Sequence, residues 1–256
     1  MANYLAEYYD AVINWERRLE RELPLLENLA RGAGGRVLVA ACGTGGHVAA
    51  LARRGFRVLG LDVDPDMVAF AQERLEREAN AIAAAGGEAK ISLLTMQESG
   101  KLGPVYDAVF CLGNALPGIA GAGELGAALK GVVGALRAGG LWFTQNLNYD
   151  RRWKEKAAWF PLLTGETAKE EVLLVKFAAY DDQGIDFHVM YLVREKTGGK
   201  WQSRVRSSRQ APLFASVLAE ELGQAGFGKL QYWGDYGQAP FDPEKSNDLL
   251  VVGTKV

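Results

Sequence analysis

Apolar residues recur along most of the chain with the periods of helices and of short buried strands. Between residues 11 and 31 they return every three or four positions, with charges between them, which predicts one amphipathic helix. Further on, short apolar runs alternate with helical patterns, which predicts a parallel sheet with right-handed helical crossovers. The predicted strands are residues 36–41, 56–61, 88–95, 105–112 and 141–147, and the predicted helices between them are 46–54, 65–85 and 124–137.

The period changes to two between residues 170 and 209. Val172 and Leu174 alternate with Leu173 and Val175 along one such segment. Turns rich in Gly and Asp, at residues 181–184 and 197–200, separate three strand-like segments. This pattern predicts an antiparallel meander.

The α/β pattern resumes after the meander. It predicts a helix at 213–225 and strands at 229–233 and 249–254. We therefore expect a doubly wound, mostly parallel α/β core made of residues 1–150 and 210–256. Residues 151–209 would be a small antiparallel β insert, which we expect to act as a substrate lid.

A glycine-rich turn, Cys42-Gly43-Thr44-Gly45-Gly46, joins the first predicted strand to the next helix. A strand, a glycine turn and a helix N-terminus together present backbone N–H groups to a ligand. A P-loop would end in Lys-Ser/Thr, but His47 and Val48 stand there, so that interpretation fails. Val48 also occupies the third glycine position of a dinucleotide fingerprint, which disfavours NAD. Another nucleotide-like cofactor, or a turn without a ligand, remains.

Four motifs in order make the sequence resemble the class I S-adenosylmethionine (SAM)-dependent methyltransferases. They are ACGTG after the first strand, FRVLGLDVDPDMV around the second, YDAVFCLGNAL at the fourth and LRAGGLWFTQNLNYD at the fifth. Each motif is weak by itself, but the ordered set is specific. The resemblance implies a seven-stranded, Rossmann-like methyltransferase sheet, SAM as the cofactor and methyl transfer as the reaction.

The resemblance also implies which residues contact the cofactor. Asp62, at the end of the second strand, would accept the ribose hydroxyls, because Asp64 is the better helix cap. Gln97 would accept the adenine amino group in place of the acidic residue common in the family, or it is a solvated loop residue. The remaining predicted cofactor contacts are Ala41, Gly43, Thr44, Gly45, Val63, Met67, Met96 and Leu112.

The N-terminal helix contains Trp15-Glu16-Arg17-Arg18, which is similar to the W-x-x-R of glycine and glycine/sarcosine N-methyltransferases. By that similarity Arg18 would pair with the SAM carboxylate, as bidentate arginines do. The alternative is a solvated charge on an exposed helix face. Tyr4, Tyr8 and Tyr9 would line the mouth of the site or simply pack.

Three residues are candidates for a catalytic role. Asn114 follows the fourth strand, where the family faces its methyl acceptor, although it could equally hold the loop in an Asx-turn. Tyr149 lies just after the fifth strand. His188, within the insert, would be a base if it faced the site, and otherwise an ordinary strand histidine.

Two positions depart from the family pattern. Val39 replaces the acidic residue that the family has on the first strand, near the SAM amino group. Leu147 replaces the arginine that holds the glycine carboxylate in glycine N-methyltransferases, which argues against glycine as the acceptor. We therefore predict methyl transfer to a nitrogen or oxygen of a small molecule. The alternative is a non-catalytic SAM-binding or degenerate methyltransferase-fold protein with a regulatory or binding role.

Charge and composition narrow the classes of partner and compartment. A net charge of −2 without a basic cluster argues against nucleic acid. No apolar run is long enough to predict a membrane span, and no signal-peptide pattern is present. With two cysteines and two histidines, neither a disulfide framework nor a metal site is expected. We expect a cytoplasmic protein whose partner is a small-molecule methyl acceptor, with homo-oligomerisation left open.

Overall fold

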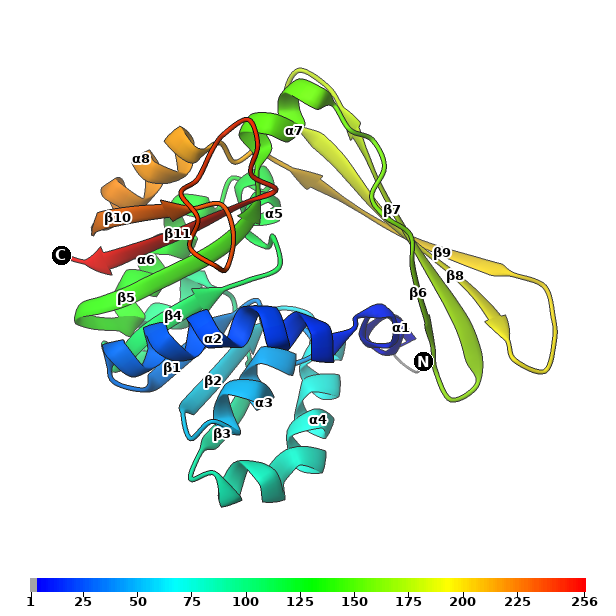
Figure 1. Cartoon of the computed structure of the whole chain (residues 1–256), viewed down its shortest axis with the longest axis horizontal. Helices are drawn as coiled ribbons and strands as arrows, with labels where there is room; N and C mark the ends of the chain where they lie inside the picture. The colour runs from blue at the N-terminus through cyan, green and yellow to red at the C-terminus, as the bar shows by residue number, and fades with distance from the viewer. Residues whose placement is uncertain (1–3) are drawn as a thin grey trace.

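The computed structural model describes residues 4–256, and a seven-stranded sheet forms its centre (Figure 1). The strand order is β10-β11-β5-β4-β1-β2-β3. Neighbours from β3 to β5 pair in parallel, whereas β11 is antiparallel to both β5 and β10. The strands are β1 Arg36–Ala40, β2 Arg57–Asp62, β3 Glu88–Leu93, β4 Tyr106–Cys111, β5 Leu136–Leu147, β10 Phe227–Trp233 and β11 Asp248–Lys255. The predicted doubly wound, mostly parallel sheet is confirmed.

Helices cover both faces of this sheet because its strands are apolar on both sides. Val37 and Val39 of β1 pack in the cluster that includes the helix Trp15–Ala33, whereas Leu38 and Ala40 pack in the opposite cluster. The helices of the core are α2 Trp15–Ala33, α3 Gly46–Ala52, α4 Pro65–Ala84, α5 Leu116–Gly121, α6 Leu125–Ala135 and α8 Ala215–Ala225, with a 3-10 helix η1 at Gln97–Leu102. Asp64 caps α4 by accepting the N–H of Asp66, as predicted.

The N-terminal segment differs from its prediction. The single helix expected at 11–31 is two helices, α1 Tyr4–Val12 and α2 Trp15–Ala33. Asn14 ends the continuity because its side chain accepts the N–H of Arg17 and so caps the second helix. The apolar period continues across this break, so periodicity alone did not locate it.

The insert is a separate four-stranded antiparallel sheet beside α1 (Figure 1). Its strands are β6 Leu163–Glu166, β7 Glu170–Tyr180, β8 Ile185–Glu195 and β9 Gln202–Gln210, and the helix α7 Tyr149–Glu155 leads into it. The three predicted strands are present, whereas β6, α5 and α7 were not predicted because each is short. Tyr8 and Val12 of α1 pack against Val172, Leu174 and other residues of the insert.

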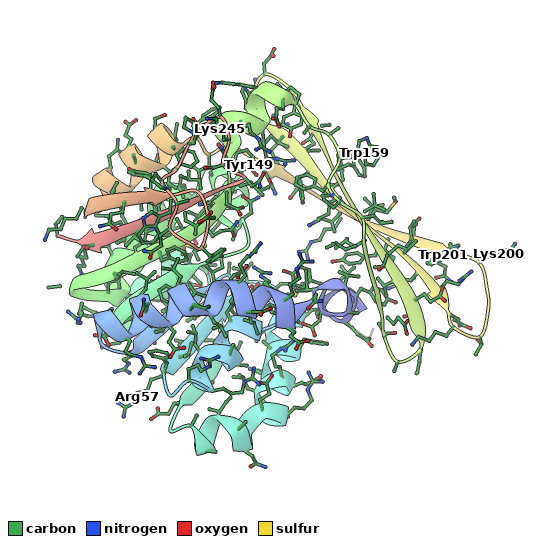
Figure 2. All side chains as sticks on the ribbon, in the orientation of Figure 1. Arg57, Tyr149, Trp159, Lys200, Trp201 and Lys245 are labelled. Carbon is green, nitrogen blue, oxygen red and sulfur yellow. The ribbon has the colours of Figure 1, made fainter. Side chains whose placement is uncertain are left out.

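Two contacts fix the orientation of the insert. Arg206 of β9 forms an ion pair with Asp64, 2.8 Å long, beside the end of β2. Tyr8 donates to Glu170 of β7 at 2.7 Å. Two insert aromatics, Trp159 and Trp201, are exposed and lie on the side away from the core (Figure 2). The inner face of the insert therefore faces α1 and the carboxyl edge of the large sheet.

No helix among residues 4–256 is long and apolar enough to cross a membrane. In the same residues, no three His, Cys, Asp or Glu side chains gather where they could hold a metal ion.

Candidate functional site

Three adjoining cavities follow the carboxyl edge of the parallel strands. The smallest, about 110 Å³, lies on the glycine turn. A cavity of about 330 Å³ lies beyond the end of β2 and shares Ala41 and Ala115 with it. A cavity of about 590 Å³ lies under the insert and shares Tyr9, Arg18 and Gly113 with the smallest one. This is the edge at which doubly wound sheets bind ligands.

The glycine turn needs backbone conformations that favour glycine. Gly43 and Gly45 have φ values of 55° and 77°, and Ala41 also has a positive φ, 52°. A Cβ on Gly45 would lie 2.9 Å from the Cβ of Ala71, so α4 packs directly on the turn. The predicted residues Ala41, Gly43, Thr44 and Leu112 line the smallest cavity, whereas Gly45 shapes the turn from outside that lining.

Asp62 joins the turn to the second cavity. Its Oδ2 accepts the N–H of Gly43 at 2.7 Å, and its Oδ1 accepts the N–H of Asp64 at 3.0 Å. Each carboxylate oxygen has about two acceptor sites, so each can accept one further bond. Asp62 lines the 330 Å³ cavity, and the geometry leaves it able to accept a pair of hydroxyl groups there.

The remaining walls of the 330 Å³ cavity come from the loops after β2 and β3. The predicted residues Val63, Met96 and Gln97 line it together with Ile119 of α5. Gln97 donates from Nε2 to Glu124 at 2.6 Å, which orients its amide. Met96 and Ile119 give this cavity apolar walls, and the amide of Gln97 is among its polar groups.

Asp10, at the end of α1, holds the glycine turn from outside. Its Oδ1 accepts from Trp15 Nε1 at 2.6 Å, from Thr44 Oγ1 at 2.8 Å and from Arg74 Nη2 at 2.5 Å. Arg74 also donates to the carbonyl oxygen of Thr44. One carboxylate thus connects α1, α2, the turn and α4.

Trp15 fills the space between α2 and the start of α3. A Cβ on Gly46 would lie 2.4 Å from the Trp15 ring, so only glycine fits there. The guanidinium groups of Arg18 and Arg74 each lie 5.3 Å from this ring. The W-x-x-R pattern therefore has a structural role in addition to the role that the resemblance implies.

A buried ionic cluster lies beneath the smallest cavity. Glu22, with 2% of its side chain exposed, contacts His47 Nε2 at 2.7 Å, Arg18 Nε at 3.2 Å and Arg21 Nη2 at 2.8 Å. Although burial opposes ionisation, the bond to His47 and the charge of Arg18 lower the pKa of Glu22 to about 2. Burial lowers the pKa of His47, which favours the neutral ring. The cluster orients Arg18 toward Gly113, whose Cβ position lies 3.4 Å from Arg18 Nη2.

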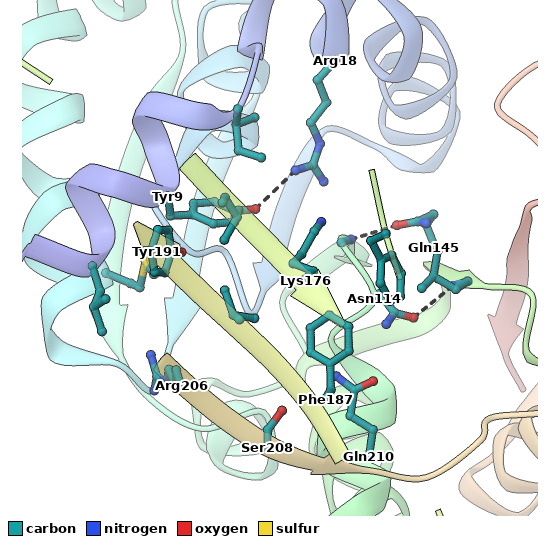
Figure 3. A pocket seen from close by; sticks show the side chains of 18 of the residues that line it. Tyr9, Arg18, Asn114, Gln145, Lys176, Phe187, Tyr191, Arg206, Ser208 and Gln210 are labelled. Carbon is teal, nitrogen blue, oxygen red and sulfur yellow. Dashed lines mark hydrogen bonds between the residues drawn. The ribbon is translucent and has the colours of Figure 1, made fainter. Parts of the chain in front are cut away.

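The cavity of about 590 Å³ has one wall from the core and one from the insert (Figure 3). Met67, predicted to contact the cofactor, lines this cavity and not the two smaller ones. The insert contributes Phe160, Leu174, Lys176, Phe187, Val189, Tyr191, Arg206 and Ser208, and Gln210 follows at the end of β9. The charged residues from the core side are Arg18, Arg21, Glu22 and Asp248.

Gln145 links the core wall of this cavity to the end of β4. Its Oε1 accepts the N–H of Gly113 at 2.9 Å, and its Nε2 donates to Asp248 Oδ1 at 2.9 Å. Burial raises the pKa of the Asp248 carboxyl above its usual range. The Asp248 carboxyl therefore lines the cavity and is connected to Gly113 through the Gln145 amide.

Asn114 and Tyr149 form a connected chain rather than a pair of free groups. Asn114 has a φ of 63°, its Oδ1 accepts the N–H of Leu147 at 2.9 Å, and its Nδ2 donates to the Tyr149 hydroxyl at 3.0 Å. The Tyr149 hydroxyl donates in turn to Gln210 Oε1 at 3.0 Å. Asn114 lines the cavity, whereas Tyr149 is 2% exposed and is not part of its lining. Burial raises the pKa of Tyr149 to about 12, so the hydroxyl is protonated at neutral pH.

The Tyr149→Phe variant separates a bracing role from a catalytic one. Because only the hydroxyl is lost, we expect the free energy of unfolding to fall by about 1–2 kcal/mol, while turnover of any acceptor that the wild type methylates stays within about tenfold. Thermal unfolding and initial rates measure the two effects. A thousandfold loss of turnover at unchanged stability would instead assign Tyr149 to catalysis.

His188 lies on the opposite face of β8 from the cavity, which corrects the expectation that it could face the site. Phe187, Val189 and Tyr191 line the cavity, and successive side chains of a strand point to opposite faces. His188 stacks on Phe177 at 4.6 Å between ring centroids and hydrogen-bonds Ser207 at 2.7 Å. His188 is therefore an ordinary strand histidine, which was the alternative to a catalytic base.

Several residues of the site were not predicted from the sequence. They are Asp10, Glu22, Arg74, Gln145, Lys176 and Asp248. Only Gln145 lies within one of the quoted motifs, and the partners of these residues lie up to 103 positions away, as for Gln145 and Asp248. The period-two pattern of the insert predicts that Lys176 shares a face with Val172 and Leu174. It does not predict what that face contacts.

Comparisons with known proteins agree with this architecture. A family model described as a methyltransferase domain matches residues 37–140. Glycine N-methyltransferase of Rattus norvegicus is 35% identical over 120 residues, which are 45% of this chain and 41% of that protein. Glycine/sarcosine N-methyltransferase of Parasynechococcus marenigrum is 30% identical over 144 residues, 56% of this chain and 49% of that protein. The chain thus spans about half the length of the curated relatives it matches.

Solved structures match over almost the whole chain. An S-adenosylmethionine-dependent methyltransferase from Clostridium acetobutylicum has a TM-score of 0.72 at 12% identity and covers 91% of this chain and 89% of its own. SAM-bound CalS10, an amino pentose methyltransferase from Micromonospora echinaspora, has a TM-score of 0.65 at 21% identity. This match covers 99% of the present chain and 96% of CalS10. At these identities the matches show the fold. Residues 37–140 therefore match the methyltransferase domain model, and the chain shares the fold of these solved SAM-dependent methyltransferases.

Proposed function

We propose that this protein is a SAM-dependent methyltransferase that methylates a nitrogen or oxygen of a small molecule. The observation that carries the proposal is the continuity of the three cavities. The two smaller ones follow the glycine turn and Asp62, and the largest opens from the same junction at Arg18 and Gly113. A cofactor in the first two would present its reactive end to an acceptor in the third.

The residues of the smaller cavities fit this cofactor. Asp62 has acceptor capacity for the ribose hydroxyls, and Gln97 lies at the rim of a cavity suited to adenine. Arg18, oriented by Glu22, would pair with the cofactor carboxylate. When bound, SAM supplies an activated methyl group on its sulfonium. The chain's own contribution is to bind and orient both molecules and to exclude water.

Two observations support nitrogen as the acceptor atom in the cavity of about 590 Å³. Asp248 lines this cavity and is connected to Gly113 through Gln145, and a carboxyl with a raised pKa is a stronger base toward an incoming ammonium. The curated relatives at 30–35% identity are named as N-methyltransferases. Leu147 lines this cavity, and its apolar side chain cannot pair with the carboxylate of glycine. The cavity, about 590 Å³, is also large enough for a molecule bigger than glycine.

The insert supplies the outer wall of the cavity of about 590 Å³, which we call the acceptor cavity. We propose that residues 151–209 act as the lid of this cavity. The Arg206–Asp64 ion pair connects that lid to the end of β2. Acceptor choice then depends on the inner face of the insert, which varies independently of the cofactor-binding motifs.

A second candidate function is SAM binding without catalysis. Val39, where the resemblance implies an acidic residue, is 1% exposed and lines the smallest cavity. An apolar side chain there offers no acceptor to the cofactor's amino group. Binding of SAM without methyl transfer to any small amine or hydroxyl compound would favour this candidate.

Calorimetric titration with SAM and S-adenosylhomocysteine tests the proposed function. We expect saturable binding by the wild type and at least a tenfold weaker affinity in Asp62→Ala, because charge-assisted hydrogen bonds contribute about 1.5–3 kcal/mol each. Asp66→Ala, an exposed carboxylate on the first turn of α4, is the matched control and should bind like the wild type. No binding at millimolar cofactor would contradict the proposal.

A further inference from the structure

Lys176 is a charged group of the acceptor cavity without a counterion. It lies on β7, on the face of the insert that also carries Leu174, and Figure 3 shows its amine pointing into the cavity. Among the hydrogen bonds and ion pairs of residues 4–256, none involves its side chain. The Nζ atom of Lys176 lies 5.7 Å from the centroid of the Phe160 ring.

The other cations of this cavity each have a carboxylate. Arg18 and Arg21 pair with Glu22, and Arg206 pairs with Asp64. Asp248 accepts from the neutral Gln145 amide.

Burial, together with the charges of Arg18 and Arg152, lowers the pKa of Lys176. A partly buried amine beside two guanidinium groups is unfavourable unless an anion joins it. The cavity therefore has one unbalanced positive site, on the insert side.

We infer that Lys176 binds an anionic group of the methyl acceptor, a carboxylate or a phosphate, and so determines acceptor specificity. This inference rests on the proposed function. The acceptor would be a molecule with an amine at one end, beside Gly113 and Asp248, and the anion at the other, on Lys176. Leu147 is apolar and cannot bind the anion. In this proposal Lys176 of the insert provides the positive charge instead.

A lysine amine suits this task for a simple reason. It is a compact charge with three donors on a flexible stem, so it can follow anions of different shape. Phe160, Phe187 and Tyr191 line the same cavity and would pack against the apolar or ring portion of such a molecule.

Amine acetylation read by peptide mass spectrometry tests the anion site without any cofactor. The full-length protein, with no SAM added, is treated with an amine-selective acetylating ester in sodium acetate, in sodium phosphate, or in sodium chloride of equal ionic strength. We expect acetate or phosphate to slow labelling of Lys176 at least fivefold relative to chloride, and the more protective of the two identifies the class of anion. Lys200, exposed in the turn between β8 and β9, is the internal control and should label equally in all three.

Matched acceptors test specificity. Methyl transfer to O-phosphoethanolamine is compared with ethanolamine, and 3-aminopropanoate with 3-aminopropanamide. In the wild type we expect the anionic member of the pair to have at least a tenfold higher kcat/KM. Lys176→Met should abolish that preference, Lys176→Arg should keep most of it, and Lys200→Met should leave it unchanged.

The two proposals fail in different ways. Equal labelling of Lys176 in all three salts, with SAM binding intact, would overturn the anion site and leave the proposed function standing. Protection of Lys176 in a protein that does not bind SAM would support the anion site and remove the methyltransferase assignment. An anionic preference unchanged in a folded Lys176→Met variant would overturn the role of Lys176.

Discussion

Replacing Glu22 with alanine should lower the free energy of unfolding by about 3–5 kcal/mol and the melting temperature by about 10 °C. Glu22 is the shared partner of Arg18, Arg21 and His47, and its side chain is 2% exposed. Its removal leaves a mostly buried guanidinium and a buried imidazole without their acceptor. Thermal and urea unfolding of the two proteins measure the loss.

A matched variant separates this cluster from the general effect of losing a charge on α2. Glu20→Ala removes an exposed carboxylate two positions away and should change stability by less than about 0.5 kcal/mol. Equal effects of Glu20→Ala and Glu22→Ala would contradict the importance of the cluster.

The pH dependence of stability gives an independent check. In the wild type the pKa of folded Glu22 is about 2, against 4.5 for an unperturbed glutamate, so the unfolded state takes up the proton first as pH falls. The stabilisation by Glu22 is thus complete above pH 4.5 and is lost between pH 4.5 and 2. The difference between wild type and Glu22→Ala should shrink over that range. His47, whose pKa is lowered by burial, makes the wild type less stable as pH falls below about 6.5.

The second large effect is expected on cofactor affinity in Asp10→Ala. Asp10 accepts from Trp15, Thr44 and Arg74, and so it holds the glycine turn in shape before any ligand arrives. Without it, ordering the turn would be part of the cost of binding. We expect SAM to bind about 10- to 100-fold more weakly, although Asp10 itself lines none of the three cavities. Calorimetry with SAM measures the change.

A double-mutant cycle isolates the contribution of this carboxylate. Thr44→Val removes one donor to Asp10, so its effect and that of Asp10→Ala should not add. Coupling of at least 0.5 kcal/mol is expected. Additive losses would show that Asp10 acts elsewhere, through the docking of α1 alone.

Local signals in the sequence predicted the core well. The alternation of apolar runs and helices predicted a parallel, doubly wound sheet, and Asp64-Pro65 marks the start of α4 as predicted. Ten of the eleven predicted cofactor contacts line one of the three cavities, and the eleventh, Gly45, shapes the turn. Their assignment to SAM stays a prediction until binding is measured.

The acceptor side was much less predictable. Asn114 lines the cavity of about 590 Å³, but its side chain is held by Leu147 and Tyr149. His188 faces away from the cavity, and Lys176, twelve positions earlier in the insert, faces into it. Both lie in segments of period two. The sequence therefore predicts that neighbouring side chains point to opposite faces, but it does not predict which face contacts the core.

The sequence by itself determined the α/β class, the glycine turn and the acidic residue after β2, because these depend on local periodicity and on backbone preferences of Gly, Asp and Pro. Only the tertiary structure decided which side chains meet. The Asp10–Thr44, Glu22–His47 and Gln145–Asp248 contacts join residues 34, 25 and 103 positions apart. Such contacts depend on how helices and sheets pack, since no pattern within one element specifies the element that it will touch.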